Sequence, residues 1–288
     1  MIRKPAVAGQ FYERNKEKLL GQLEWCFRHP FGPGELPKKE RKGFVRGAIV
    51  PHAGYMFSGP CAAHVYKEIA ESEFPDLYLF LGPSHIGFHK TCFSMDDWET
   101  PLGLVRSDEE FGKILEDNEI DLIPIPHQEE HSIEVQLPFL QYVSKEKKER
   151  IKFIPIMVAE DWKDSVELIK KSIAEYEKKK RKVCIIASSD FTHYGFNYGY
   201  TPFLADIKEN LNKLDNGAID KIKKMDVLGF VNYCEMTGAT ICGRAPIAAL
   251  LTVLKEKVKK AELLKYYTSG DMVGDHSSAV GYAGIVFR

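Results

Sequence analysis

Several features that would assign the chain to a common class of protein are missing from its sequence. Its six cysteines lie far apart, without the CxxC pairs of structural zinc knuckles or thioredoxin-like sites. The segment Met1 to Tyr12 has two early basic residues but no sustained apolar stretch, so it predicts neither a signal peptide nor a membrane anchor. The most apolar helical stretch, Ala245 to Leu254, is too short to span a bilayer. We therefore expect a cytoplasmic protein with free thiols and no contact with a membrane.

An excess of charge of either sign is also missing. The 40 Lys and Arg residues balance 41 Asp and Glu residues, and the formal net charge of -1 gives no general attraction for nucleic acid. Two basic runs, Lys145 to Arg150 and Lys178 to Lys182, lack interleaved aromatic residues, and we interpret both as solvated surface. The second run ends a predicted helix, where cations complement the negative end of the helix dipole. We therefore expect no nucleic-acid partner.

Short β-branched runs alternate with amphipathic helical patterns along the chain. Its 288 residues, 44% of them hydrophobic, suffice for one large α/β domain, and we predict a single domain over residues 1–288. The alternation favours a central, mainly parallel sheet with helices on both faces. The predicted strands are 45–50, 77–81, 152–158, 183–187 and 280–287, and the predicted helices are 19–27, 61–70, 108–115, 162–176 and 246–258.

Three of the predicted strands end in a turn that carries a histidine. His52 follows the first strand, His85 the second and His193 the fourth. The carboxyl ends of parallel strands meet at one edge of a sheet, where open α/β proteins form their ligand crevice. One such histidine is typical of a structural side chain, whereas three at equivalent positions indicate a shared site. We therefore expect these imidazoles to converge.

Two less regular segments carry further groups for this site. His127 to Glu134 contains two histidines and three carboxylates, and we expect His131 and Ser132 near the start of the helix that follows. Either this segment contributes polar groups to the site, or Ser132 simply caps that helix. Cys242 lies in a turn before a helix whose early Pro246 suits the first turn. A thiol there is biased toward thiolate, the form that binds metal.

Six motifs follow one another between Ala6 and Ile247: AVAGQFYE, PHAGYMFSG, GPSH, EEHSIEVQLPFL, SSDFTHYG and TICGRAPI. Together they resemble the Memo family, which includes the B component of the archaeal and bacterial AmmeMemoRadiSam group. Memo proteins are similar in fold to class III, LigB-type extradiol dioxygenases, so the resemblance implies one α/β domain around a central sheet. It also implies a metal site made by His52, His85 and Cys242. Asp190 and His193 would line the same pocket.

The implied donor set suits iron(II) or copper, with zinc as a further choice. Imidazoles bind all three metals, while a thiolate favours soft or borderline ones. Extradiol dioxygenases have a carboxylate where this chain has Cys242, and an oxidisable thiolate changes the redox potential, so dioxygenase activity does not carry over directly. We predict a metal-dependent, dioxygenase-like oxidoreductase. In it His193 is the acid/base group, Asp190 orients His193 or binds substrate, and His131 contacts substrate or supports a ligand.

Two other functions stay open. The crevice could recognise a small molecule or a peptide without turnover, a role that the association of animal Memo proteins with phosphotyrosine peptides implies for the family. Arg244, beside Cys242, would then hold an anionic group. Alternatively, the resemblance implies an AmmeMemoRadiSam assembly with radical-SAM and AMMECR-type proteins as partners.

Overall fold

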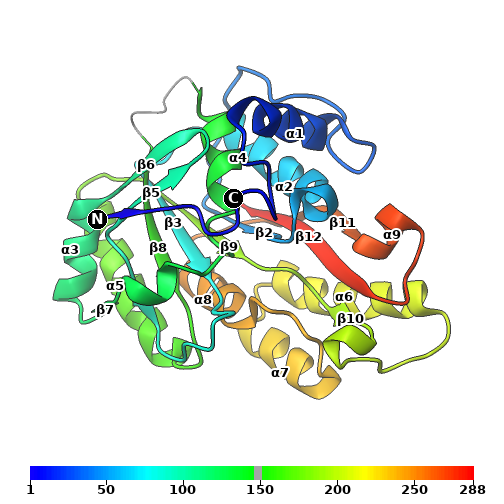
Figure 1. The fold of residues 1–288 in the computed structure, drawn as a ribbon. Helices are drawn as coiled ribbons and strands as arrows, with labels where there is room; N and C mark the ends of the chain where they lie inside the picture. The colour runs from blue at the N-terminus through cyan, green and yellow to red at the C-terminus, as the bar shows by residue number, and fades with distance from the viewer. Residues whose placement is uncertain (146–150) are drawn as a thin grey trace.

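Five parallel strands form the centre of the sheet in the computed structural model, which describes residues 1–145 and 151–288 (Figure 1). Their order across the sheet is β6-β8-β3-β9-β2. Most of their residues are apolar and buried, as expected for strands covered on both faces. The bounds are β2 (Gly47–Val50), β3 (Leu77–Gly82), β6 (Gly103–Ser107), β8 (Lys152–Met157) and β9 (Val183–Ser188).

Antiparallel pairs extend this parallel centre on both sides. Beyond β2, strand β12 (Ala279–Phe287) pairs antiparallel with β2, β10 and β11. On the other side, β5 pairs antiparallel with β6, and β4 pairs antiparallel with β8. The predicted class, a mainly parallel α/β sheet, is thus confirmed, although β6 was not predicted, and neither were β11 and the short strands. These strands are β1 (Ile2–Arg3), β4 (Cys92–Phe93), β5 (Asp97–Thr100), β7 (Asp121–Leu122), β10 (His193–Tyr194) and β11 (Ala261–Thr268).

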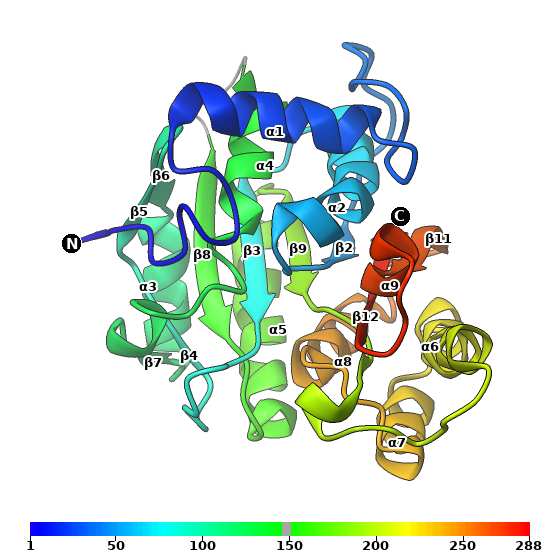
Figure 2. The same cartoon turned by 45° about the vertical axis from the view of Figure 1, so that its right-hand side comes forward.

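Helices cover both faces of the sheet, as predicted (Figure 2). Alternate residues of β3 point into two separate cores: Leu79 packs with the layer of α3, α5 and α8, and Phe80 packs with the layer of α1, α2 and α4. Helices α6 and α7 extend the layer of α3, α5 and α8, because α7 contacts α8 and α6 contacts both α7 and β11. The bounds are α1 (Lys16–Arg28), α2 (Tyr55–Ala70), α3 (Glu109–Asp117), α4 (Gln136–Val143), α5 (Trp162–Lys178), α6 (Ile207–Lys223), α7 (Val227–Thr237), α8 (Arg244–Leu254) and α9 (Ser269–Val273), with 3-10 turns η1 (Ile125–His127) and η3 (Phe196–Tyr198).

Differences from the predicted helices have local causes. Helix α2 begins at Tyr55, whereas the sequence predicts a start at Cys61. Pro60 lies inside the second turn of α2, and a proline at such a position is unfavourable in a helix. Helix α6 was not predicted, because its asparagines and Gly217 have low helix propensity and its buried face includes the charged Asp215. Helices α7 and α9 were not predicted either. Helix α8 ends at Leu254, earlier than predicted.

The remaining expectations concern the surface. Residues 178–182 are exposed at the end of α5, so this basic run is solvated surface as predicted. Lys179 and Lys182 form ion pairs there with Glu110 and Glu73. Of the other basic run, residues 146–150 lie outside the described residues. None of the described helices is long and apolar enough to cross a membrane.

Candidate metal centre

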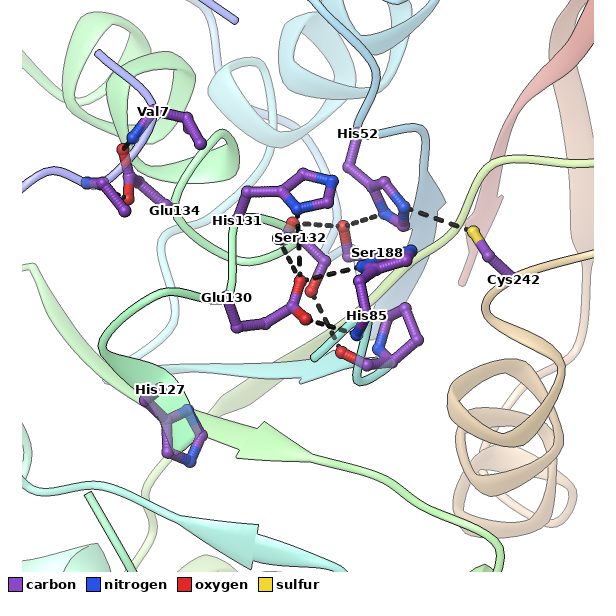
Figure 3. Close-up of polar contacts among 12 residues, drawn as sticks. Val7, His52, His85, His127, Glu130, His131, Ser132, Glu134, Ser188 and Cys242 are labelled. Carbon is purple, nitrogen blue, oxygen red and sulfur yellow. Dashed lines mark hydrogen bonds and ion pairs between the residues drawn. The ribbon is translucent and has the colours of Figure 1, made fainter. Parts of the chain in front are cut away.

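Three potential metal ligands from distant parts of the chain meet at the carboxyl ends of the central strands. His52 follows β2, His85 follows β3, and Cys242 lies in the turn before α8. One ligand atom from each side chain lies within 4.8 Å of the others, and Cys242 Sγ is 3.2 Å from His52 Nε2 (Figure 3). His52 is buried, whereas His85 and Cys242 are partly exposed. The expected convergence therefore occurs, with one side of the cluster accessible.

A buried hydrogen-bond network determines which nitrogen of His52 carries the proton. Ser188 Oγ donates to Ser132 O at 2.6 Å and accepts from Gln136 Nε2 at 2.8 Å. Because the single hydroxyl proton is already used, Ser188 Oγ can only accept from His52 Nδ1, 3.0 Å away. Gln136 Nε2 also donates to Pro51 O, which fixes the orientation of this amide. His52 therefore carries its proton on Nδ1 and leaves the lone pair of Nε2 for a ligand.

Glu130 holds His85 in the matching orientation. Its carboxylate accepts from the backbone N of His85 at 2.6 Å, from His85 Nδ1 at 2.9 Å and from Ser132 N at 2.8 Å. Burial lowers the pKa of His85, but the hydrogen bond and charge of Glu130 outweigh this and raise it. Burial likewise opposes ionisation of Glu130, yet its bonds with His85 lower the pKa of this carboxyl to about 2. Glu130 is therefore ionised, and it was missed as an individual site residue because five polar neighbours surround it in the sequence.

The turn that carries Cys242 packs closely against the turn after β9. A Cβ at Gly243 would lie 2.3 Å from Ser189 Cβ, so this turn requires glycine. Burial, with the charge of Asp190, raises the pKa of the Cys242 thiol well above its ordinary value. Without a bound metal ion, the expected bias toward thiolate is therefore wrong for this turn, because desolvation outweighs the hydrogen bonds to the sulfur. A metal ion would have to displace the thiol proton on binding. Pro246 does lie in the first turn of α8, as predicted.

His193 and Asp190 flank the three potential ligands, each with its own partner. His193 Nδ1 donates to Thr240 O at 3.0 Å, and His193 N donates to Thr240 Oγ1 at 2.9 Å. Both contacts fix the ring of His193 through its Nδ1 side. Asp190 Oδ1 accepts from the backbone N of His52 at 2.7 Å. Thr240, which the sequence reasoning missed, therefore orients His193, while Asp190 supports the turn that carries His52.

His131 belongs to the same cluster, stacked on His85 with ring centroids 4.6 Å apart. Its ring lies 4.6 Å from Phe11 on another side, and burial followed by the charge of His85 lowers its pKa to about 4. Ser132 is not the cap of the following helix, because α4 begins at Gln136 and Ser132 Oγ donates to Pro83 O. The capping interpretation is therefore wrong, and the segment contributes polar groups to the cluster.

His127 does not join this cluster. It is buried beside Cys92, with its Nε2 3.8 Å from the sulfur, and Figure 3 shows its ring apart from His52 and His85. Burial, with the charge of Arg3, lowers its pKa to about 4. His127 is therefore a neutral core residue, and the two histidines of this short segment have different roles.

A pocket of about 550 Å³ adjoins the cluster on the Cys242 side. Phe88, Trp162 and Pro246 contribute apolar wall, while Arg244 and Lys163 contribute positive charge. Carboxylates also line it, at Glu160 and Glu235. The pocket is therefore large enough for a small organic molecule and offers it both apolar and charged contacts.

Fold and side-chain geometry together define an α/β protein with two histidines and a cysteine gathered at its strand ends. A model of the family described as Memo-like protein matches residues 3–286. A MEMO1 family protein of Methanopyrus kandleri is 42% identical over 295 residues, covering 100% of this chain and 99% of that protein. Another, from Sulfurisphaera tokodaii, is 40% identical over 296 residues with the same coverage. The chain therefore belongs to the Memo-like family.

A solved structure shares the fold at much lower sequence similarity. It is that of an uncharacterized protein from Escherichia coli K12, with a TM-score of 0.54 and 9% identity. The match covers 85% of this chain and 100% of the other. At this identity the likeness shows the fold alone, and it confirms the predicted α/β architecture.

Proposed function

We propose that the protein binds iron(II) or copper through His52, His85 and Cys242 and acts as an oxidoreductase. The convergence of two imidazoles and a thiol within 4.8 Å of one another carries this proposal. The donor set fits, because imidazole suits iron, copper and zinc, and a thiolate favours the softer of these metals. Both Nε2 lone pairs are directed by hydrogen bonds at Nδ1, the support that metal-bound histidines have in general.

The chain's own groups would bind substrate and move protons, while bound iron or copper would supply electron transfer. His193 is the proposed acid/base group, because Thr240 holds its Nδ1 and so leaves Nε2 as the nitrogen for proton transfer. His131 would contact the substrate, since its neutral ring covers one side of His85. The pocket beside Cys242 would hold a small organic substrate. Because Memo proteins are similar in fold to extradiol dioxygenases, catechols are the first class of substrate to test. We propose that the protein acts in the cytoplasm.

The second candidate function is recognition of an anionic small molecule or peptide without turnover. The observation that favours it is the presence of Arg244 and Lys163 in the wall of the pocket next to Cys242. A guanidinium matches carboxylate or phosphate geometry, so such a ligand would bind there whether or not it reacts. Membership of an AmmeMemoRadiSam assembly, with radical-SAM and AMMECR-type partners, stays a prediction from the resemblance.

The test of metal binding is anaerobic purification, removal of bound metal with a chelator, and titration with iron(II) or copper(I). We expect the wild type to bind one ion, with a metal–sulfur bond visible by X-ray absorption spectroscopy. Cys242→Ser should weaken binding and lose the metal–sulfur signal. Cys184→Ser is the matched control, because Cys184 lies buried within β9. Equal losses in both variants, or no binding by the wild type, would overturn the proposal.

A further inference from the structure

The carboxylate of Glu130 is the most heavily engaged group next to the candidate ligands. It is buried, and it contacts His85 at two points, the backbone N and the ring Nδ1. A third donor, Ser132 N, shares the oxygen that accepts from the ring. From the other side Arg3 Nη2 donates to Glu130 O at 2.9 Å, which holds the backbone of the residue. The carboxylate is therefore held in place independently of any metal ion.

This engagement argues against Glu130 as a metal ligand, although its oxygen lies within 4.8 Å of ligand atoms of His85 and His131. Ligation through Oε1 would break the bonds from His85 Nδ1 and Ser132 N, and Oε2 is occupied by the backbone N of His85. The carboxylate instead acts on the metal centre through the imidazole that it contacts. We propose that Glu130 is a positioning residue that keeps His85 protonated on Nδ1, with Nε2 available at the point shared with His52 and Cys242.

The physical reason is the combination of charge and two-point contact. Without a partner at Nδ1, a neutral imidazole can carry its proton on either nitrogen, and a proton on Nε2 would block the ligand position. An ionised acceptor strengthens the Nδ1–H bond relative to a neutral one, such as Ser188 beside His52. The second contact, at the His85 backbone N, restrains the turn after β3. Glu130 thus fixes both the tautomer of His85 and the position of its ring.

The first test needs no metal, so it separates this inference from the proposed function on which its purpose rests. Long-range proton–nitrogen NMR of the histidine rings in chelator-treated protein reports which nitrogen carries each proton. At a pH at which the His85 ring is neutral, we expect its Nδ1–H form in the wild type. Glu130→Gln should shift His85 toward the Nε2–H form and leave His52, held by Ser188, unchanged. An Nε2–H form of His85 in the wild type would overturn the proposal without any variant.

The second test measures metal affinity by competition with a chelator. Glu130→Gln should weaken binding of iron(II) or copper(I) roughly 10- to 100-fold, the usual effect of removing a partner of a metal-bound histidine. Glu129→Gln is the matched control, because it makes the same change at the adjacent, exposed residue and should bind as the wild type does. Glu130→Asp retains the charge but is one methylene shorter, so it should give an intermediate loss.

The outcomes are distinguishable. An unchanged tautomer and unchanged affinity in Glu130→Gln would refute the positioning role while leaving metal binding intact. Failure of the wild type to bind metal, with His85 switching its tautomer in Glu130→Gln, would refute the proposed function and retain the positioning role. Equal losses of affinity in Glu129→Gln and Glu130→Gln would refute a specific role for Glu130.

Discussion

Replacement of Arg3 should destabilise the protein far more than replacement of an ordinary surface cation. Arg3 is fully buried, with Nη1 2.6 Å from Glu134 Oε2 and its guanidinium 4.1 Å from the Trp98 ring. Its Nε donates to His127 O at 2.6 Å, and Nη2 donates to Glu130 O. The N-terminal segment is thereby bonded to the segment that carries Glu130. Arg3→Met keeps apolar packing volume but removes all of these donors.

The magnitude follows from the groups left behind. Removing one partner of a buried ion pair costs roughly 3–5 kcal/mol, because the other charge stays buried. Glu134 retains donors at Ala6 N, Val7 N and Tyr12 Oη, which compensate in part. We therefore expect Arg3→Met to lower the free energy of unfolding by about 3 kcal/mol, at the low end of that range. The combined Arg3→Met, Glu134→Gln variant should lose less than the sum of the two single changes.

Urea unfolding at neutral pH measures these differences. Lys4→Met is the matched control, because Lys4 makes an exposed ion pair with Glu99, and such pairs contribute about 0–1 kcal/mol. A free energy of unfolding for Arg3→Met equal to that for Lys4→Met would refute the reasoning. Additive effects of Arg3→Met and Glu134→Gln would show that the two side chains are not coupled.

Three further predictions concern other parts of the molecule. His193→Gln should leave metal content intact but abolish dioxygen consumption by the iron-loaded protein across a catechol panel, because His193 is not a proposed ligand; loss of metal from this variant would contradict that assignment. Burial raises the pKa of Asp215 to about 6 despite its hydrogen bonds, so the folded state binds this proton more tightly than the unfolded state. Stability should therefore fall by on the order of 3 kcal/mol as the pH rises from about 4 through 6, and Asp215→Asn should remove that dependence in pH-resolved thermal unfolding. Gly82→Ala would place a Cβ 2.7 Å from both Ser132 Oγ and Ile133 Cγ1, and should cost roughly 1–3 kcal/mol in calorimetry; an unchanged melting temperature would show that the segment moves freely.

Local sequence patterns determined most of the central strands of this fold and showed that candidate ligands follow the ends of these strands. Apolar, β-branched runs predicted the central strands β2, β3, β8 and β9 close to their observed bounds, because side-chain burial and β-propensity act on neighbouring residues. Parallel pairing then places all their carboxyl ends at one edge, so His52 and His85 were expected together. The position of Cys242 in a turn before a helix made it a further candidate, and the resemblance to a known family joined it to the two histidines as one ligand set.

Only the tertiary structure decided the chemical state of those groups. The proton position on His52 depends on Ser188, Ser132 and Gln136, which are distant in sequence and meet only in the folded core. The pKa of the Cys242 thiol depends on desolvation by surrounding atoms, and this reversed the expectation drawn from its place before a helix. The periodicity of apolar residues along the sequence indicates which face of a helix or strand is buried. Hydrogen bonding and desolvation depend on which atoms of other elements come within a few ångströms, and the chain order does not contain that information.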